Sequence, residues 1–289
     1  MTAVTIIIPT FNMGRTVWDA VRSVTQQDAD WCLIVVDDGS QVPFSAPENL
    51  SGDSRISVIR HSTNRGASAA RNTGLAAAET PWVGFLDADD TLEPNTLARR
   101  LNFAIQHLEN GDCDPSRTFF ASAWHETDRA TGARIIRTPL GADTPIQFAS
   151  GCWWSPGSVL LCHRSAFAGL EYDENLTRLE DFDLFLRAAC NGVSLVVDPT
   201  VAANIQPSNR VNLSKIQSTA TQIQQKHAEL KSTNPPVWRA MNAYLQLELS
   251  TASFRANHFG AALYHAVRSL WFKPRLTRHF SPGWTRRIS

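Results

Sequence analysis

The sequence predicts an α/β fold, in which a mostly parallel sheet is flanked by helices and followed by a C-terminal helical appendage. Short runs of β-branched and aromatic residues alternate with segments of helical spacing up to about residue 205, a pattern typical of βαβ units. From about Leu213 only the helical period remains. The chain has 289 residues, enough for one large domain plus an appendage. We therefore expect a domain over residues 1–205 and a helical region over residues 206–289.

The first half predicts a parallel sheet because its apolar runs are continuous, as in strands buried on both faces. The expected strands are Val4–Ile8, Leu33–Val36, Ile56–Ile59 and Trp82–Leu86. Between and after them, the spacing of apolar residues predicts three helices. These are Arg15–Gln27, Gly66–Ala78 and a helix with the stripe Leu97, Leu101, Ile105 and Leu108. Pro94 is expected in the first turn of the third helix, where proline is favoured.

The second half is less regular. It predicts strands at Thr118–Trp124, Arg134–Arg137, Gly157–Leu161 and Ser194–Val197, the first two forming a hairpin about Thr131-Gly132 and the last ended by Asp198-Pro199. Glu180–Cys190 has the alternation of an amphipathic helix. Pro235-Pro236 starts a helix towards Phe254, and Ala261–Phe272 is its partner in an αα-hairpin, which we expect to be a separate small unit.

Composition and charge limit the class of protein. No apolar run approaches the 18 or more residues of a membrane span, and the N-terminus lacks the basic flank of a signal peptide. The five cysteines are scattered, which favours reduced thiols and a cytoplasmic location. The net charge is zero, but seven Lys and Arg residues and no acid follow Glu248. This basic tail predicts an interaction surface.

The most informative stretch is Phe85-Leu86-Asp87-Ala88-Asp89-Asp90. An apolar strand ends there in three carboxylates, at the edge where open α/β sheets bind ligands. Carboxylates this close repel one another unless they are solvated or share a cation. Mg²⁺ or Mn²⁺ held beside a phosphate uses this arrangement, whereas the simpler alternative is a solvated acidic turn. Asp37-Asp38 ends a second strand of the same sheet.

Four motifs follow one another in order: Ile-Ile-Ile-Pro-Thr-Phe-Asn (6–12), Val-Val-Asp-Asp-Gly-Ser (35–40), Asn-Arg-Gly-Ala-Ser-Ala-Ala-Arg-Asn-Thr-Gly (64–74) and Phe-Leu-Asp-Ala-Asp-Asp (85–90). Together with Gly-Ser-Val-Leu-Leu (157–161) and Leu-Glu-Asp-Phe-Asp-Leu-Phe-Leu-Arg (179–187), the chain resembles the inverting glycosyltransferases of family 2, which have the GT-A fold. The resemblance covers roughly residues 3 to 200. It implies transfer of a sugar from a nucleotide-diphosphate sugar to an acceptor hydroxyl, with inversion.

The resemblance also implies roles for individual residues. The donor nucleotide-sugar would be bound by Pro9, Thr10, Phe11, Asp38, Arg71, Asp87 and Ala88, and Asp89 would coordinate Mn²⁺ or Mg²⁺ at the two phosphates. Asp181 would be the general base, with Glu180 on the acceptor side. Trp153 and Trp154 depart from the family pattern, and as tryptophans beside a loop on the acceptor side they are candidates for acceptor binding. UDP is the expected nucleotide, with GDP and dTDP open. Physically, the leaving diphosphate needs a cation, and the attacking hydroxyl must lose its proton to a carboxylate on the opposite side.

Each role has a structural alternative. Asp37 or Asp38 could cap a turn, and Arg71 could pair with an acid on a helix surface. Glu180 and Asp181 could be first-turn charges, and we expect the helix N-terminus to favour the ionised form of Asp181. Trp153 and Trp154 could stack on a sugar or belong to the core.

Partners and location follow from the same reasoning. We expect a nucleotide-sugar donor and a glycan, lipid-linked or other hydroxyl acceptor, and no nucleic acid. The aromatic and basic tail suggests peripheral contact with the inner face of the membrane, with a solvated tail or a protein partner as alternatives. The alternative function is a catalytically silent nucleotide-sugar-binding scaffold of the same fold. A nucleotidyltransferase is disfavoured by the poor phosphate loop at residues 9–15, and a dehydrogenase by the lack of Gly-x-Gly-x-x-Gly after a strand.

Overall fold

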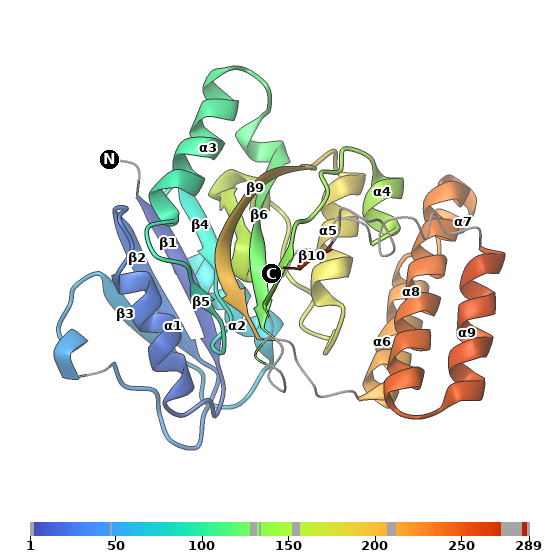
Figure 1. Ribbon diagram of the computed structural model, residues 1–289, viewed down its shortest axis with the longest axis horizontal. Coiled ribbons are helices and arrows are strands. Elements are labelled where there is room, and N and C mark those ends of the chain that lie inside the picture. The colour runs from blue at the N-terminus through green and yellow to red at the C-terminus, as the bar shows by residue number, and fades with distance from the viewer. Residues whose placement is uncertain are drawn as a thin grey trace.

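One mixed sheet forms the centre of the molecule (Figure 1). The computed structural model describes residues 3–46, 48–127, 132, 134–151, 157–206, 212–272 and 285–287. Within these residues, ten strands form the sheet: β1 (Val4–Thr10), β2 (Trp31–Asp37), β3 (Ile56–Arg60), β4 (Trp82–Phe85), β5 (Thr91–Leu92), β6 (Thr118–Thr127), β7 (Arg134–Arg137), β8 (Leu160–His163), β9 (Ser194–Ile205) and β10 (Thr285–Arg287). Their order is β10-β7-β6-β8-β4-β1-β2-β3, with β9 paired to both β6 and β5.

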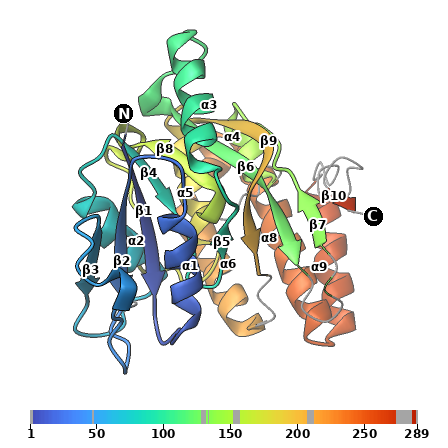
Figure 2. The ribbon, with the colours of Figure 1, turned by 60° about the vertical axis from the view of Figure 1, so that its left-hand side comes forward.

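The helices cover the two faces of the sheet and build a bundle at one side of it (Figures 1 and 2). Their bounds are α1 (Thr16–Thr25), α2 (Ala67–Ala77), α3 (Leu97–Glu109), α4 (Pro145–Ala149), α5 (Glu180–Cys190), α6 (Leu213–Lys226), α7 (Leu230–Thr233), α8 (Pro235–Arg255) and α9 (Phe259–Trp271). The predicted fold class, a mixed α/β domain followed by a helical C-terminal region, is confirmed.

The parallel part of the sheet is the part that the continuous apolar runs predicted. Strands β4, β1, β2 and β3 are all parallel, and every residue of β1 is buried because helices cover both faces. In register, Thr10 lies opposite Asp37, and Ile7 lies opposite Phe85. The segments that follow β1, β2 and β4 therefore leave the sheet at the same edge.

The other half of the sheet is largely antiparallel. β8 lies between β4 and β6 and is antiparallel to both. β6 and β7 are antiparallel, as the predicted hairpin requires, and Thr131 of its predicted turn lies outside the described residues. The expected strand at Gly157–Leu161 was wrong in its first part, because Gly157–Val159 is a 3₁₀ turn and β8 begins at Leu160.

Two predicted element ends were also wrong. Asp198-Pro199 does not end β9, because Asp198 pairs with Ser122 and Val201 with Ala123, which leaves Pro199 in a bulge where its missing N–H costs no ladder bond. Pro94 lies outside α3. That helix begins at Leu97, where the side-chain oxygen of Gln27 accepts hydrogen bonds from Thr96 N and Leu97 N, both at 3.0 Å.

The helical region shares a hydrophobic core with the sheet domain. The Tyr244 ring of α8 stacks on Phe182 of α5 with centroids 4.6 Å apart, and Met241 and Leu245 lie in the same cluster. The hairpin is therefore not a separate unit, although the expected αα-hairpin of α8 and α9 is present. The division of the chain after residue 205 coincides with the end of β9 and stays a prediction.

A buried ion cluster also holds the helical region in place. The fully buried Asp183 of α5 pairs with Lys226 at 2.9 Å and with His227 at 2.8 Å, both at the end of α6, and with Arg187 of its own helix. Burial opposes the charge of Asp183, but these partners hold its pKa down at about 2.

Gly151 offers a test of how tightly the helical region packs. It has φ +66°, and a Cβ there would lie 2.1 Å from Tyr244 Cε2, in a ring already fixed against Phe182. We expect Gly151→Ala to lower the free energy of unfolding by about 3 kcal/mol, from backbone strain plus overpacking. The matched control is Gly169→Ala, which has φ +72° and open space, and should cost only about 1 kcal/mol. Equal losses in urea unfolding would contradict the packing described here.

Candidate active site

The acidic motif lies at the carboxyl edge of the sheet, as predicted. Asp87, Ala88, Asp89 and Asp90 directly follow β4, next to the ends of β1 and β2. The Asp87 side chain is 37% exposed, whereas Asp90 is almost fully buried. The carboxylates therefore differ in what they can reach, since Asp87 is open to solvent and Asp90 is not.

Asp90 fixes the shape of this edge. Its Oδ2 accepts a hydrogen bond from Ser158 Oγ at 2.6 Å, and its Oδ1 accepts one from Gln206 N at 2.9 Å. Ser158 Oγ in turn accepts a hydrogen bond from Asp87 N at 3.1 Å. Burial, together with the nearby charges of Asp87 and Asp89, raises the pKa of Asp90 to about 8. Asp90 thus joins the end of β4 to the turn before β8 and to the chain after β9.

The ends of β1 and β2 supply the other predicted donor-side residues. Pro9 and Thr10 are the last two residues of β1 and are buried, and Phe11 is 43% exposed just beyond the strand. Asp38 is buried, and its oxygens accept hydrogen bonds from Arg65 N at 2.9 Å and Gly66 N at 2.7 Å. Asp38 therefore anchors the loop before α2, and its predicted contact with a base stays a prediction.

Asp37 has the structural role given above as its alternative, which is to cap a turn. Its carboxylate accepts hydrogen bonds from Ser40 N and Phe44 N, each at 3.0 Å, and pairs with Arg60. Burial alone would raise the pKa of Asp37, but these hydrogen bonds and Arg60 hold it below its usual value. Asp37 caps the turn that follows β2.

Arg71 joins the donor side of the site to the acceptor side. Its guanidinium donates to Asp87 Oδ1 at 2.9 Å and to Glu180 Oε1 at 3.1 Å, and lies over the Tyr172 ring with 5.3 Å to the centroid. The side chain is only 5% exposed, so it is not the surface pair that was the alternative. One buried cation therefore holds two carboxylates from segments about a hundred residues apart.

Asp181 is the least satisfied carboxylate of the site. Its Oδ1 is buried and has no hydrogen-bond partner among the residues described. Burial raises the pKa of Asp181 to about 7, against the attraction of Arg71 and helped by repulsion from Glu180 and Asp87. The predicted contribution of the helix N-terminus stays a prediction, and the net effect of the surroundings is a raised pKa of Asp181.

The backbone before Asp181 is strained. Leu179, which caps α5, has φ +56° and lies in the left-handed region that non-glycine residues rarely adopt. Such strain commonly occurs at functional sites, where the surrounding packing maintains it. Here the partly buried Leu179 side chain packs against the core and holds the conformation.

Several residues that shape the site were not predicted. Asn72 exchanges two hydrogen bonds with the backbone of Tyr172, both at 2.9 Å, and so fixes the ring under Arg71. Ser158 was recognised only as part of a motif. The sequence signal for Asn72 was its place beside Arg71 in the motif at 64–74, but its partner lies a hundred residues away. Trp153 and Trp154 lie outside the described residues.

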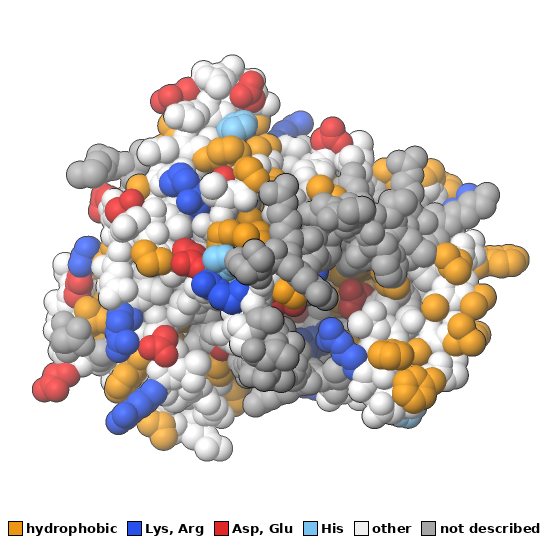
Figure 3. Space-filling view, in the orientation of Figure 1, with side chains coloured by type: hydrophobic (Ala, Val, Ile, Leu, Met, Phe, Trp, Pro, Cys, Tyr) orange, Lys and Arg blue, Asp and Glu red, His pale blue; other side chains and the backbone are white. Residues whose placement is uncertain are grey.

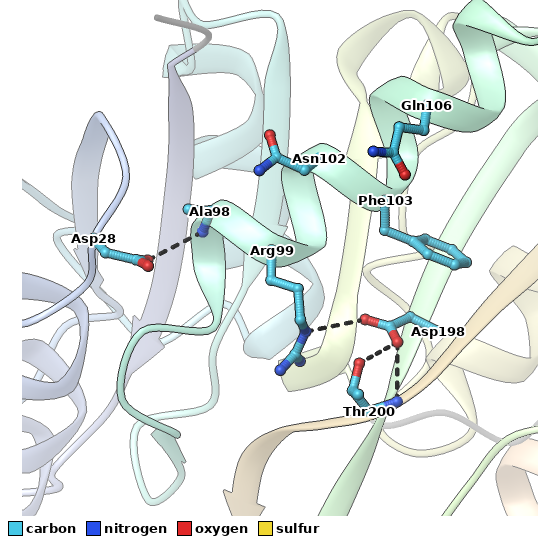
Figure 4. A pocket seen from close by; sticks show the side chains of 8 residues that line it. All are labelled: Asp28, Ala98, Arg99, Asn102, Phe103, Gln106, Asp198 and Thr200. Atoms are coloured by element: carbon cyan, nitrogen blue, oxygen red, sulfur yellow. Dashed lines mark hydrogen bonds and ion pairs between the residues drawn. The ribbon is translucent and has the colours of Figure 1, made fainter.

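A surface pocket of about 520 Å³ lies elsewhere, on α3 and the bulge of β9 (Figure 4). Its lining residues are Asp28, Ala98, Arg99, Asn102, Phe103, Gln106, Asp198 and Thr200. Asp28 precedes β2, so the pocket lies towards the amino ends of the strands. None of the predicted site residues lines it.

Comparison with known proteins identifies the family. The family model for "Glycosyl transferase family 2" matches residues 5–154, which is more than half of the chain. The chain belongs to glycosyltransferase family 2. The match includes the four motifs of the carboxyl edge and ends before α5, so it does not reach Glu180 or Asp181.

A relative and two solved structures extend this result. The succinoglycan biosynthesis protein ExoU of Rhizobium meliloti is 32% identical over 202 residues, or 66% of this chain and 58% of ExoU. The chain thus spans little more than half the length of that relative. The mannosyltransferase PcManGT from Pyrobaculum calidifontis, in complex with GDP-Man and Mn²⁺, has a TM-score of 0.59 at 18% identity and covers 97% of this chain and 83% of its own. S. aureus TarS 1-349 in complex with UDP has a TM-score of 0.56 at 15% identity. The match covers 100% of this chain and 96% of the TarS chain. These two structures show a shared fold.

The carboxylate oxygens at the end of β4 fit a divalent cation that a diphosphate helps to hold. Among the described residues, no group of three or more His, Cys, Asp and Glu side chains could hold a metal ion by itself. Mg²⁺ and Mn²⁺ commonly take one or two carboxylates and complete their shell with phosphate oxygens and water. Asp89, beside Asp87 at the end of β4, is suited to that role.

Asp181 and Asp183 lie on the same helix in opposite environments, and this gives a test. Asp181 has a raised pKa, so its ionised form costs stability progressively from about pH 4 to pH 7. Asp181→Asn should therefore be more stable than wild type by up to about 4 kcal/mol at pH 8, and by less at pH 5. Asp183 has a lowered pKa and stabilises the fold above about pH 4, so Asp183→Asn should lose about 3 kcal/mol at both pH values. Urea unfolding at the two pH values measures this. Loss of stability in both variants would contradict the assignment of Asp181.

Proposed function

We propose that the protein transfers a sugar from a nucleotide-diphosphate sugar, preferably a UDP-sugar, to an acceptor hydroxyl with inversion. Asp181 is the general base, and a divalent metal assists. The observation that carries the proposal is the arrangement about Arg71, with Asp87 on one side and Glu180 and Asp181 on the other. The reaction needs a donor side and a proton acceptor held opposite each other, and this cluster supplies both.

The properties of Asp181 support its role as the base. A carboxylate with a pKa of about 7 is a better proton acceptor than an ordinary aspartate, and its Oδ1 has no hydrogen-bond partner among the described residues. In the proposed step, the acceptor O–H gives its proton to Asp181 as the oxygen bonds to the anomeric carbon. The bond from that carbon to the diphosphate oxygen breaks, and the diphosphate leaves with the electron pair. A single displacement of this kind inverts the anomeric centre.

The donor assignment rests on the carboxyl edge and on the relatives. Phe11 is exposed beside the buried Thr10 and can lie against a nucleobase, and Asp87 is accessible to hydroxyl groups. TarS 1-349 was solved with UDP, and PcManGT with GDP-Man and Mn²⁺, which supports a nucleotide-sugar donor. Asp89 would hold Mn²⁺ or Mg²⁺, which when bound neutralises charge developing on the leaving diphosphate. ExoU is named a succinoglycan biosynthesis protein, which supports a glycan acceptor.

The second candidate is a silent scaffold that binds nucleotide sugars without transfer. A scaffold has no need for a carboxylate whose buried oxygen lacks a hydrogen-bond partner among the described residues, because such a group lowers stability. The presence of Asp181 in that state, together with Asp89, favours the enzyme.

The pH dependence of turnover tests the base. Because Asp181 must be ionised to accept a proton, kcat/KM should rise with pH through an apparent pKa near 7 and then level off. Asp181→Asn should lower kcat by about 10²–10⁴-fold and still bind UDP. Transfer assays at about unit steps from pH 5.5 to 8.5 measure the pH dependence of kcat/KM and the kcat of the variant. An Asp181→Asn protein with near-normal turnover would overturn the mechanism.

Thermal stability with nucleotides tests the donor and metal assignments. A ligand that binds only the folded protein raises the melting temperature. We expect UDP with Mn²⁺ to raise the melting temperature more than UDP alone or GDP does. The Asp89→Asn variant should lose this metal-dependent rise. Asp181→Asn is the matched control, since it should keep the metal-dependent rise. No rise with any nucleotide would remove both the enzyme and the scaffold proposals, whereas a rise without turnover by wild type would favour the scaffold.

A further inference from the structure

Helix α9 presents large apolar side chains to solvent along its length. Six of them are 55–84% exposed: Phe259, Leu263, Tyr264, Val267, Leu270 and Trp271. At about 100° per residue they lie within an arc of about 140°, on one side of the helix. We call this surface the α9 apolar face. Hydrophobic side chains gather at the corresponding edge of the molecule in Figure 3.

The helix is packed the opposite way from an ordinary surface helix. Towards α8 it directs small and polar side chains. Ser269 Oγ donates to Ala243 O at 2.8 Å, and His265 Nδ1 lies 2.8 Å from Gln246 Oε1. A helix that only needs to cover a protein core buries its apolar side and exposes its polar side. Here the large apolar residues are left for another partner.

The surroundings of the α9 apolar face are positively charged. Between residues 235 and 272 the only acid is Glu248, whose pKa is raised by burial. Three arginines in the same stretch are exposed: Arg239, Arg255 and Arg268.

This charge distinguishes between the two simplest occupants. A symmetric contact between two copies would bring the same basic surface against itself, which is repulsive. An anionic bilayer instead attracts the arginines, takes the aliphatic side chains into its boundary, and accommodates Tyr264 and Trp271 at headgroup level. We propose that α9 is a docking helix that lies in the plane of an anionic membrane surface.

The arrangement of the helices is compatible with such docking. No helix in the described part of the chain has the length and apolar content to cross a bilayer, so the proposed contact is peripheral. α8 lies between α9 and the sheet domain (Figure 1). The Arg71 cluster is therefore separated from the docked surface by at least one helix layer, roughly 10 Å. The site differs from the predicted contact of the tail, most of which lies outside the described residues.

Vesicle flotation of the full chain tests the proposal. The vesicles are phosphatidylcholine alone, or phosphatidylcholine with about 30% phosphatidylglycerol, in about 0.1 M salt. We expect wild type to float with the anionic vesicles only, and less at about 1 M salt. The double variant Leu263→Ser, Val267→Ser should lower the partition coefficient at least about tenfold, because two aliphatic side chains no longer enter the lipid. No donor or acceptor is present, so the result does not depend on catalysis.

The matched control is Val42→Ser, which removes a side chain that is 82% exposed but lies outside α9. It should float like wild type, and melting temperatures check that every variant is folded. The proposal is overturned by folded wild type that does not float, or by a double variant that floats as well as wild type. If wild type does not float but is a dimer, and the double variant is a monomer, the face would be assigned to a second copy of the chain.

Discussion

The buried guanidinium of Arg71 is the interaction on which the site depends. It comes from α2, reaches Asp87 at the end of β4, and reaches Glu180 at the start of α5. A buried charge is stable only when it is paired, so this side chain helps to fix the distance between the end of β4 and the start of α5. Asn72, the next residue, fixes Tyr172 beneath it through paired hydrogen bonds.

Acids in and around the site are in very different states. Cations and hydrogen bonds hold Asp37 and Asp183 ionised, whereas desolvation raises the pKa values of Asp90 and Asp181. The first pair keeps a turn and a helix in place. The second pair costs stability, and of these two acids Asp181 has a buried oxygen without a hydrogen-bond partner among the described residues. The separation of pKa values between neighbouring acids is what would let one of them accept a proton near neutral pH.

The helical region is part of this design and also faces outwards. Its inner helices share the core of α5 through Tyr244, and the ions about Asp183 fix α6 to the helix that carries Asp181. Its outer helix, α9, exposes the large apolar side chains that the inner contact does not use. One hairpin therefore packs on one side against α5, the helix that carries the proposed base Asp181, and exposes on the other side the face proposed for docking.

The sequence alone determined the parallel strands, the helix at Glu180–Cys190 and the carboxylates at the strand ends, because hydrophobic period and strand ends are local properties. It could not decide the pKa of Asp181 or the partners of Arg71, since burial and Coulomb interactions depend on segments a hundred residues apart. It also missed the bulge that admits Pro199 and the Gln27 cap that delays α3, because the compensating group lies on another element. The outward apolar face of α9 was hidden for the same reason. The pattern shows that the helix is amphipathic, and only the packed structure shows which side is buried.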